Sequence, residues 1–218
     1  MITIVFAETS LEIIPQEIQS QPIVKKSAAK REKRPAQLVL DSSLHWQAME
    51  KLALKEKRGR PDIAHDLLKL AFDDKSEKRV FVHTINDKAI SFAPDWRPPR
   101  NYNQFVGLME ELFDKKELKD KAGKTLLKVE NKKLGQLLDE LGSNFIVLEA
   151  KGELQQLKKF SKTLRNNNAV LIGGFPHGDF INEAALEKYE KISISTVELT
   201  APIVLSKVLT LWELENER

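Results

Sequence analysis

Three short stretches of the sequence bring together residue types that could do chemistry. In KRGRPDIAH (57–65), Arg58 and Arg60 flank a glycine, and Asp62 follows Pro61 where a helix is predicted to begin. A carboxylate in the first turn of a helix often does no more than stabilise the free amide groups and the helix dipole. The same carboxylate could accept or orient a proton, which makes Asp62 a candidate general base.

The second stretch, DWRPPRNY (95–102), carries Arg97 and Arg100 on a loop that two adjacent prolines make stiff. Trp96 and Tyr102 stand on either side of these arginines. Basic groups beside aromatic faces suit single-stranded RNA, because they combine phosphate contacts with base stacking. The alternative is a surface loop whose aromatic side chains are tucked inward.

The third stretch, VLIGGFPHGDF (170–180), is a glycine-rich turn that follows an apolar run. Gly173 and Gly174 permit close backbone approach, and Pro176 stiffens the turn. Neither GxGxxG nor GxxxxGK[ST] is present, and Asp179 places an acid near the turn, so a phosphate cradle is disfavoured. Two interpretations remain, namely a turn without a ligand and a site that grips a phosphate-free cofactor such as S-adenosylmethionine by its backbone.

The elements that must position these stretches alternate between strand and helix. Apolar runs predict strands at 2–8, 144–152, 169–174 and 192–195, with helices at 153–165, 182–191 and 201–215. Such alternation predicts an α/β fold with a parallel sheet flanked by helices. Because ligands bind at the carboxyl ends of parallel strands, we expect the loops at 148–152, 172–178 and 192–199 to converge on one crevice.

The length of 218 residues predicts a single domain, 1–218, with two insertions. The segment at about 20–36 is polar and proline-bracketed, and within it KKSAAKREKR (25–34) has six basic residues against one acid. It is predicted to be a mobile loop, either solvated or in contact with an anionic partner such as RNA. KRVFVHTI and KAISFAP flank Asn86 and Asp87 and predict a β-hairpin insertion at about 78–94.

Composition excludes several classes of site. The chain has no cysteine, and its four histidines lack short-range ligand spacing, so no metal site is expected. No apolar run reaches the roughly 20 residues that cross a bilayer, and no basic leader is present, which predicts a soluble cytoplasmic protein without membrane contact. The last helix, 201–215, is apolar around much of its circumference and favours a homodimer.

Taken together, GRPDIAH, PPRNY and GGFPHG followed by SIS and a leucine resemble the Nep/Emg family of ribosome-biogenesis proteins. Its members are SPOUT pseudouridine-N1-methyltransferases that act on small-subunit ribosomal RNA. The resemblance runs in the same order over nearly the whole chain, and the length is typical of archaeal members. It implies the α/β-knot fold with a C-terminal trefoil knot, a homodimer, and S-adenosylmethionine bound in the knot.

The resemblance also implies roles for individual residues. Asp62 would lie close to the target base, while Arg60, Arg97 and Arg100 would hold the RNA hairpin loop. Arg58 and Tyr102, which neighbour these arginines, are further candidate RNA contacts, and ribosomal proteins are candidate partners. The cofactor would be contacted, largely through backbone groups, by Leu148, Gly173, Gly178, Ile194, Ser195, Thr196, Val197, Glu198 and Leu199.

The sequence departs from the family pattern at two positions, and two other functions stay open beside the main one. Gln104 stands where relatives tend to carry a basic residue, and Glu198 adds a carboxylate to the third loop. One alternative function is a non-catalytic RNA-binding assembly factor on the same fold. The other is a SPOUT methyltransferase with a different RNA target.

Overall fold

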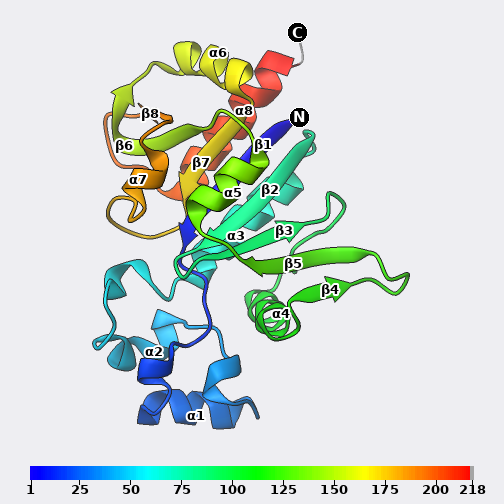
Figure 1. The fold of residues 1–218 in the computed structure, drawn as a ribbon, viewed down its shortest axis with the longest axis vertical. Helices are drawn as coiled ribbons and strands as arrows, with labels where there is room; N and C mark the ends of the chain where they lie inside the picture. Colours follow the sequence, from blue (N-terminus) through cyan, green and yellow to red (C-terminus); the bar gives the residue numbers. More distant parts are fainter. Residues whose placement is uncertain (217–218) are drawn as a thin grey trace.

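The fold is built on one eight-stranded sheet, with the strands in the order β4-β5-β3-β2-β1-β7-β6-β8 (Figure 1). The structure, a computed structural model, describes residues 1–216. Strands β2, β1, β7, β6 and β8 run parallel, which confirms the predicted parallel sheet. The strands are β1 (Ile2–Thr9), β2 (Lys78–Thr84), β3 (Lys88–Phe92), β4 (Glu117–Lys119), β5 (Thr125–Asn131), β6 (Ile146–Leu154), β7 (Ala169–Gly173) and β8 (Glu190–Ser193).

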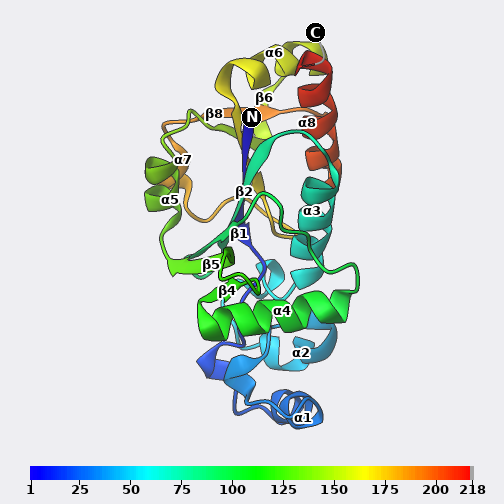
Figure 2. The same cartoon turned by 90° about the vertical axis from the view of Figure 1, so that its right-hand side faces the viewer.

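Helices cover both faces of the sheet. Figure 2 shows α3 and α8 on one face and α5 and α7 on the other. The α-helices are α1 (Pro22–Lys30), α2 (Ser42–Met49), α3 (Pro61–Asp73), α4 (Tyr102–Lys115), α5 (Leu134–Leu141), α6 (Leu157–Asn167), α7 (Glu183–Leu186) and α8 (Ala201–Asn216), and short 3-10 helices occur at Gln16–Ile18, Pro35–Gln37 and Lys55–Lys57. None of the helices described between residues 1 and 216 combines the length and apolar character that a membrane span requires.

Strand β1 lies in the interior of the sheet, and its side chains alternate between two cores. Ile4 and Phe6 pack with the apolar residues of α3, α4 and α8, whereas Val5 and Ala7 pack with those of α5 and α7. All four side chains are fully buried. A strand with apolar residues on both faces is expected where helices cover both sides of a parallel sheet.

Residues 20–36 differ from the prediction, which was a mobile loop. Pro22–Lys30 form helix α1, and Val24 and Ala28, one turn apart, are buried in a separate small core with residues of α2. This core and the segments around it form a lobe below the sheet in Figure 1. The polar composition misled the prediction because only one narrow stripe of α1 faces the protein.

The β-hairpin at 78–94 is present as β2 and β3, which pair in antiparallel register. It is not a peripheral insertion, because β2 also pairs in parallel with β1 in the middle of the sheet. Strands β3, β5 and β4 then extend the sheet in antiparallel fashion. The helix predicted at 182–191 is shorter than expected, since only Glu183–Leu186 is helical.

Strand β6 bulges where it pairs with β8. Leu148 and Glu153 of β6 both pair with Ile192, so the residues between them bulge away from the ladder. Gly152 lies in this bulge, where a Cβ atom would fall 2.6 Å from backbone atoms of Ile192. Two backbone segments therefore approach each other as closely as glycine allows.

Two buried histidines make the stability of the fold dependent on pH. Burial lowers the pKa of both His45 and His83 below the ordinary value for histidine. The unfolded chain therefore binds more protons below about pH 6.5, and the free energy of unfolding should fall as the pH is lowered through this range. Thermal melts between about pH 7.5 and 5 should show a declining Tm, and a Tm independent of pH across that window would contradict the assignment.

Candidate cofactor pocket and RNA-binding surface

A cavity of about 520 Å³ opens where the carboxyl ends of β6, β7 and β8 meet. This volume lies within the range of small-molecule sites. Its walls come from the three loops that the sequence predicted to converge, together with the first turns of α3 and α8. Eight of the nine predicted cofactor residues line it, namely Leu148, Gly173, Gly178, Ile194, Ser195, Val197, Glu198 and Leu199, whereas Thr196 is outside the lining.

The glycine-rich loop after β7 is tied to the end of β1. The N–H of Gly174 donates to the carbonyl of Ala7 at 2.9 Å, and the N–H of Ser10 donates to the carbonyl of Gly174 at 3.0 Å. A Cβ atom on Gly174 would lie 2.9 Å from the Cα atom of Thr9. Glycine is thus required here by the close approach of two backbones.

Two buried charged residues, Glu8 and Lys57, hold the far part of the loop after β7 through hydrogen bonds to its backbone. The carboxylate of Glu8 accepts hydrogen bonds from the backbone N–H groups of Ile181 and Asn182, each at 2.7 Å. The ammonium of Lys57 donates to the carbonyl of Asp179 and lies 3.7 Å from the centroid of the Phe175 ring. Burial lowers the pKa of Lys57. Lys57 therefore faces the cofactor loop rather than solvent.

Arg60 and Asp62 lie at the mouth of the pocket as an ion pair. Nε and one terminal nitrogen of Arg60 contact the two carboxylate oxygens of Asp62 at 2.8 and 2.7 Å. The hydrogen bonds to Asp62 raise the pKa of Arg60. Their side chains are 40% and 44% exposed, so both can be reached by a ligand. The candidate base is thus paired with a candidate RNA-binding arginine.

The arginine-rich loop 95–101 keeps its cations outside and one aromatic residue inside. Arg97 and Arg100 are exposed, and Arg100 forms a bidentate pair with Asp73 at 2.6 and 2.9 Å. Trp96 is buried against Phe72 and Phe92 and is therefore not placed to stack on RNA. The packing of Trp96 follows the second interpretation of this loop, while RNA binding by Arg97 and Arg100 stays a prediction.

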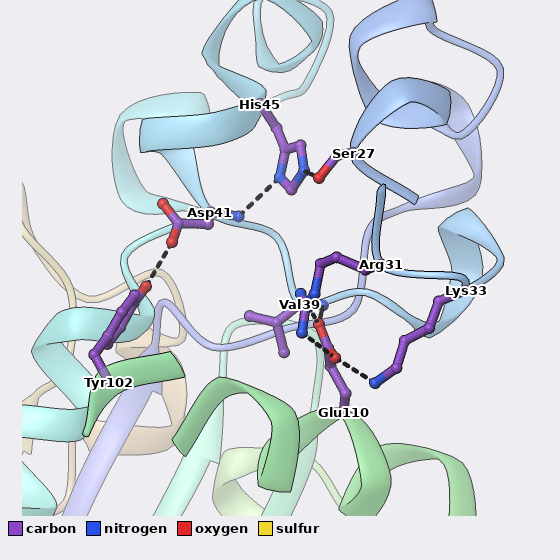
Figure 3. Close-up of polar contacts among 8 residues, drawn as sticks. All are labelled: Ser27, Arg31, Lys33, Val39, Asp41, His45, Tyr102 and Glu110. Carbon is purple, nitrogen blue, oxygen red and sulfur yellow. Dashed lines mark hydrogen bonds and ion pairs between the residues drawn. The ribbon is translucent and has the colours of Figure 1, made fainter. Parts of the chain in front are cut away.

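Tyr102, at the start of α4, is half-buried, and its hydroxyl donates to a carboxylate oxygen of Asp41 at 2.6 Å (Figure 3). Burial, followed by the hydrogen bond to Asp41, raises the pKa of Tyr102 well above its ordinary value. Asp41 also accepts a hydrogen bond from the N–H of Ser43 at 2.9 Å and thereby caps α2. Tyr102 thus joins the arginine-rich loop to the lobe.

Arg58 does not face the surface used by the other arginines. Its guanidinium forms a bidentate pair with Glu12 at 2.7 and 2.6 Å, and the Glu12 side chain is completely buried. An RNA contact at Arg58 does not fit this geometry, because breaking the pair would leave a buried carboxylate without its counter-ion. Sequence reasoning could not foresee the partner, which lies 46 residues away.

A sequence model of the EMG1/NEP1 methyltransferase family matches residues 4–213. The chain belongs to this family. Nep1 of Archaeoglobus fulgidus, named a ribosomal RNA small subunit methyltransferase, is 42% identical over 212 residues, covering 96% of this chain and 94% of the relative. Nep1 of Thermococcus sibiricus, named in the same way, is 39% identical over 221 residues and covers 98% of both chains.

The fold is also that of a solved EMG1/NEP1 structure. The crystal structure of Archaeoglobus fulgidus Nep1 bound to S-adenosylhomocysteine superposes with a TM-score of 0.91, at 38% identity and with 100% of each chain covered. The predicted family and the SPOUT-type α/β fold are confirmed. The roles of the individual site residues stay predictions.

The chemistry of the pocket fits the cofactor of an EMG1/NEP1 methyltransferase. Among the described residues that line it, Arg60 at the mouth is the single arginine or lysine, so the lining lacks the several cations that a phosphate-bearing cofactor would need. Glu149 and Glu198 add carboxylates that could meet the positive charges of S-adenosylmethionine. Within residues 1–216, no group of three or more acidic or histidine side chains is arranged to hold a metal ion.

Proposed function

We propose that this EMG1/NEP1 chain methylates N1 of a pseudouridine in small-subunit ribosomal RNA, with S-adenosylmethionine as methyl donor, during biogenesis of the small ribosomal subunit. One observation carries the proposal: the Arg60–Asp62 pair lies on the rim of the pocket formed by the loops after β6, β7 and β8. A candidate proton acceptor and a candidate phosphate ligand therefore share one space with the cofactor loops. The names of the relatives, small-subunit rRNA methyltransferases, support the substrate class.

The cofactor is assigned to the backbone of the three loops. Gly173 and Gly178 form the middle wall, Leu148 forms the first, and Ile194–Leu199 form the third, including Thr196 next to the lining residues. S-adenosylmethionine supplies a methyl group on a positively charged sulfur. The hydroxyl of Ser193 donates to the carbonyl of Ser195 at 2.9 Å, and the N–H of Val197 donates to the Ser195 hydroxyl at 3.1 Å. These bonds give the third loop a defined shape before a ligand arrives.

The Arg60–Asp62 pair suggests how the base becomes active. An RNA phosphate competes with Asp62 for the guanidinium of Arg60, since both are anions that bind it in bidentate fashion. When the phosphate takes Arg60, the carboxylate of Asp62 is released beside the target base. Asp62 would then accept the N1 proton of the pseudouridine as N1 bonds to the methyl carbon, while the carbon–sulfur bond of S-adenosylmethionine breaks and S-adenosylhomocysteine leaves. Binding of the RNA phosphate to Arg60 thus frees the Asp62 carboxylate to act as general base.

The RNA surface is assigned to Arg60, Arg97, Arg100 and Tyr102. The first three present cations to solvent, while Tyr102 orients the start of α4 through Asp41. The base to be methylated is expected to turn out of its stack, because N1 would otherwise lie beyond reach of the pocket.

The remaining expectations concern assembly and location. The likeness to the solved EMG1/NEP1 fold supports a C-terminal trefoil knot. Ile203 on α8 is 47% exposed and Val197 is 67% exposed, which supports a homodimer that would cover them. We infer a cytoplasmic protein that works on ribosomal particles and so meets ribosomal proteins.

A methylation assay on synthetic rRNA hairpins tests this function. Hairpins that carry pseudouridine at the target should gain one methyl group, mapped to N1 by mass spectrometry, while the uridine hairpin should gain none. Equal methylation of both hairpins would favour a SPOUT methyltransferase with another target. RNA binding without heat of binding for S-adenosylhomocysteine in calorimetry would favour a non-catalytic assembly factor.

A further inference from the structure

The basic residues of helix α1 and of the turn that follows it, residues 31–34, form an inner and an outer set. The outer set is exposed and consists of Lys25, Lys26, Lys30 and Arg34. The inner set, Arg31 and Lys33, follows the helix and points to α4. Val24 and Ala28 anchor the opposite side of α1 in the core of the lobe. The basic segment is therefore a fixed surface rather than a mobile tail.

The inner set is anchored by one buried carboxylate, Glu110 of α4 (Figure 3). Its two oxygens accept hydrogen bonds from Arg31 at 2.6 and 2.7 Å, and one of them accepts a third from Lys33 at 2.7 Å. The backbone N–H of Val39 adds a fourth at 3.1 Å. Because the Glu110 side chain is only 1% exposed, this cluster fixes α1 to α4 with little exchange to water.

A left-handed residue turns the chain so that both inner cations can reach Glu110. Glu32 has φ of 52°, and the N–H groups of Glu32 and Lys33 donate to the carbonyls of Ala29 and Ala28 at 3.2 and 3.1 Å. This is a Schellman turn, which glycine would form more easily than glutamate. Glu32 is also the single acid among residues 25–34.

The outer cations have no counter-ions of their own. Across residues 1–216, none of Lys25, Lys26, Lys30 and Arg34 forms an ion pair, whereas the exposed cations of Lys55, Arg100, Lys115 and Lys124 do. The guanidinium of Arg34 donates a hydrogen bond to the side-chain amide oxygen of Gln37 at 3.3 Å, which is an uncharged partner. A rigid surface with unmatched positive charge attracts a polyanion without paying the entropy of ordering a loop.

A second set of hydrogen bonds, apart from the Glu110 cluster, joins α1 to the proposed RNA surface. His45 of α2 contacts the hydroxyl of Ser27 in α1 at 3.1 Å and accepts a hydrogen bond from the N–H of Asp41, also at 3.1 Å. Asp41 in turn holds Tyr102, with which α4 begins directly after the arginine-rich loop. Figure 3 shows these contacts and the Glu110 cluster as two links between the lobe and α4.

We propose that Lys25, Lys26, Lys30 and Arg34 bind backbone phosphates of the same rRNA whose loop enters the pocket. This inference rests on the proposed function and extends the RNA footprint from the arginine-rich loop to the far end of the lobe. Helix α1 lies at the bottom of the molecule in Figure 1, so only an RNA longer than the hairpin loop itself reaches it. The contacts are with phosphates and therefore carry no sequence preference.

The test measures binding of two hairpins, one with a short and one with a long stem, by fluorescence anisotropy at several salt concentrations. The triple variant Lys25→Gln/Lys26→Gln/Lys30→Gln should bind the long hairpin roughly tenfold more weakly, with a salt slope reduced by about 2 to 3. Its affinity for the short hairpin should equal that of the unmodified protein. Glu32→Gly, which removes the acid, should bind the long hairpin about twofold more tightly.

The matched control is Lys158→Gln/Lys159→Gln/Lys162→Gln on α6, which removes the same charge from exposed positions at the opposite end of the molecule (Figure 1). It should bind both hairpins like the unmodified protein. Equal losses in the two triple variants, or no loss in the α1 variant, would overturn the proposal, the second result pointing to an acidic protein as the partner of α1.

Calorimetry with S-adenosylhomocysteine separates this inference from the proposed function. All variants should bind it as the unmodified protein does, which shows that the pocket is folded. An unmodified protein that binds neither hairpin overturns the proposed function itself. An unmodified protein that binds both, with an α1 variant that binds equally well, overturns only the role of α1.

Discussion

Replacing Asp62 by asparagine should reduce methyl transfer to the pseudouridine hairpin by roughly a hundredfold or more, the usual contribution of a general base. Asparagine has nearly the same shape but cannot accept the N1 proton. Single-turnover measurements at saturating RNA and cofactor isolate this step from binding. The affinity for S-adenosylhomocysteine should be unchanged, because the cofactor is assigned to the three loops on the other side of the pocket.

Asp66→Asn is the matched control for this substitution. Asp66 lies one turn further along α3, lines the same pocket, and pairs with Lys69 at 2.9 Å. Its loss should leave single-turnover rates within about twofold of the unmodified enzyme. If Asp62→Asn instead weakens RNA binding and excess RNA restores the full rate, Asp62 only positions Arg60, and the proton must go elsewhere.

Replacing Gly152 by alanine should destabilise the protein by about 3 kcal/mol or more, because one added methyl group would overlap backbone rather than a movable side chain. The Cβ atom would lie 2.6 Å from both the N and C atoms of Ile192. To relieve the overlap, β8 must move, and β8 leads into the third cofactor loop. Urea unfolding should show the loss of stability, and calorimetry should show weaker binding of S-adenosylhomocysteine.

Gly107→Ala provides the contrast. Gly107 lies inside α4, and apart from its chain neighbours and the backbone of its own helix no atom lies within 4 Å of the position its Cβ atom would take. Alanine there should stabilise the protein by about 0.5–1 kcal/mol, because it restricts the unfolded chain without a clash. A Gly152→Ala variant with unchanged stability would show that β6 and β8 separate easily at this bulge, which would contradict the requirement for glycine at position 152.

The parallel part of the fold could be predicted from the sequence because its signals are local. Strands β1 and β7 are short apolar runs, each followed by a change of composition, while β8 (Glu190–Ser193) begins two residues before the predicted strand at 192–195. The alternation of strands with helices implied that the strand ends would meet, and the pocket lies at that edge. The glycines of the loop after β7 also predicted a close approach of two backbone segments, and Gly174 makes such an approach to Thr9.

The lobe and the arginine residues were harder to predict because their partners are distant in sequence. Arg31 meets Glu110 across 79 positions, and Arg58 meets Glu12 across 46. The sequence of a basic run does not indicate which of its side chains will point into the protein, because that depends on the position of a buried carboxylate far along the chain. Trp96 illustrates the same difficulty, because its packing against Phe72 follows from the return of the chain to α3.

Buried Lys57 has a consequence for the way the two ligands affect each other. It lies on the same short segment as Arg60, yet its ammonium holds the carbonyl of Asp179 in the cofactor loop. A movement of the segment 57–60 is therefore transmitted through this hydrogen bond to the cofactor loop that contains Asp179, and the reverse also holds. We expect cooperative binding, in which RNA and cofactor raise each other's affinity by the same factor, as thermodynamic reciprocity requires. Cofactor loading thereby prepares the protein to capture its RNA.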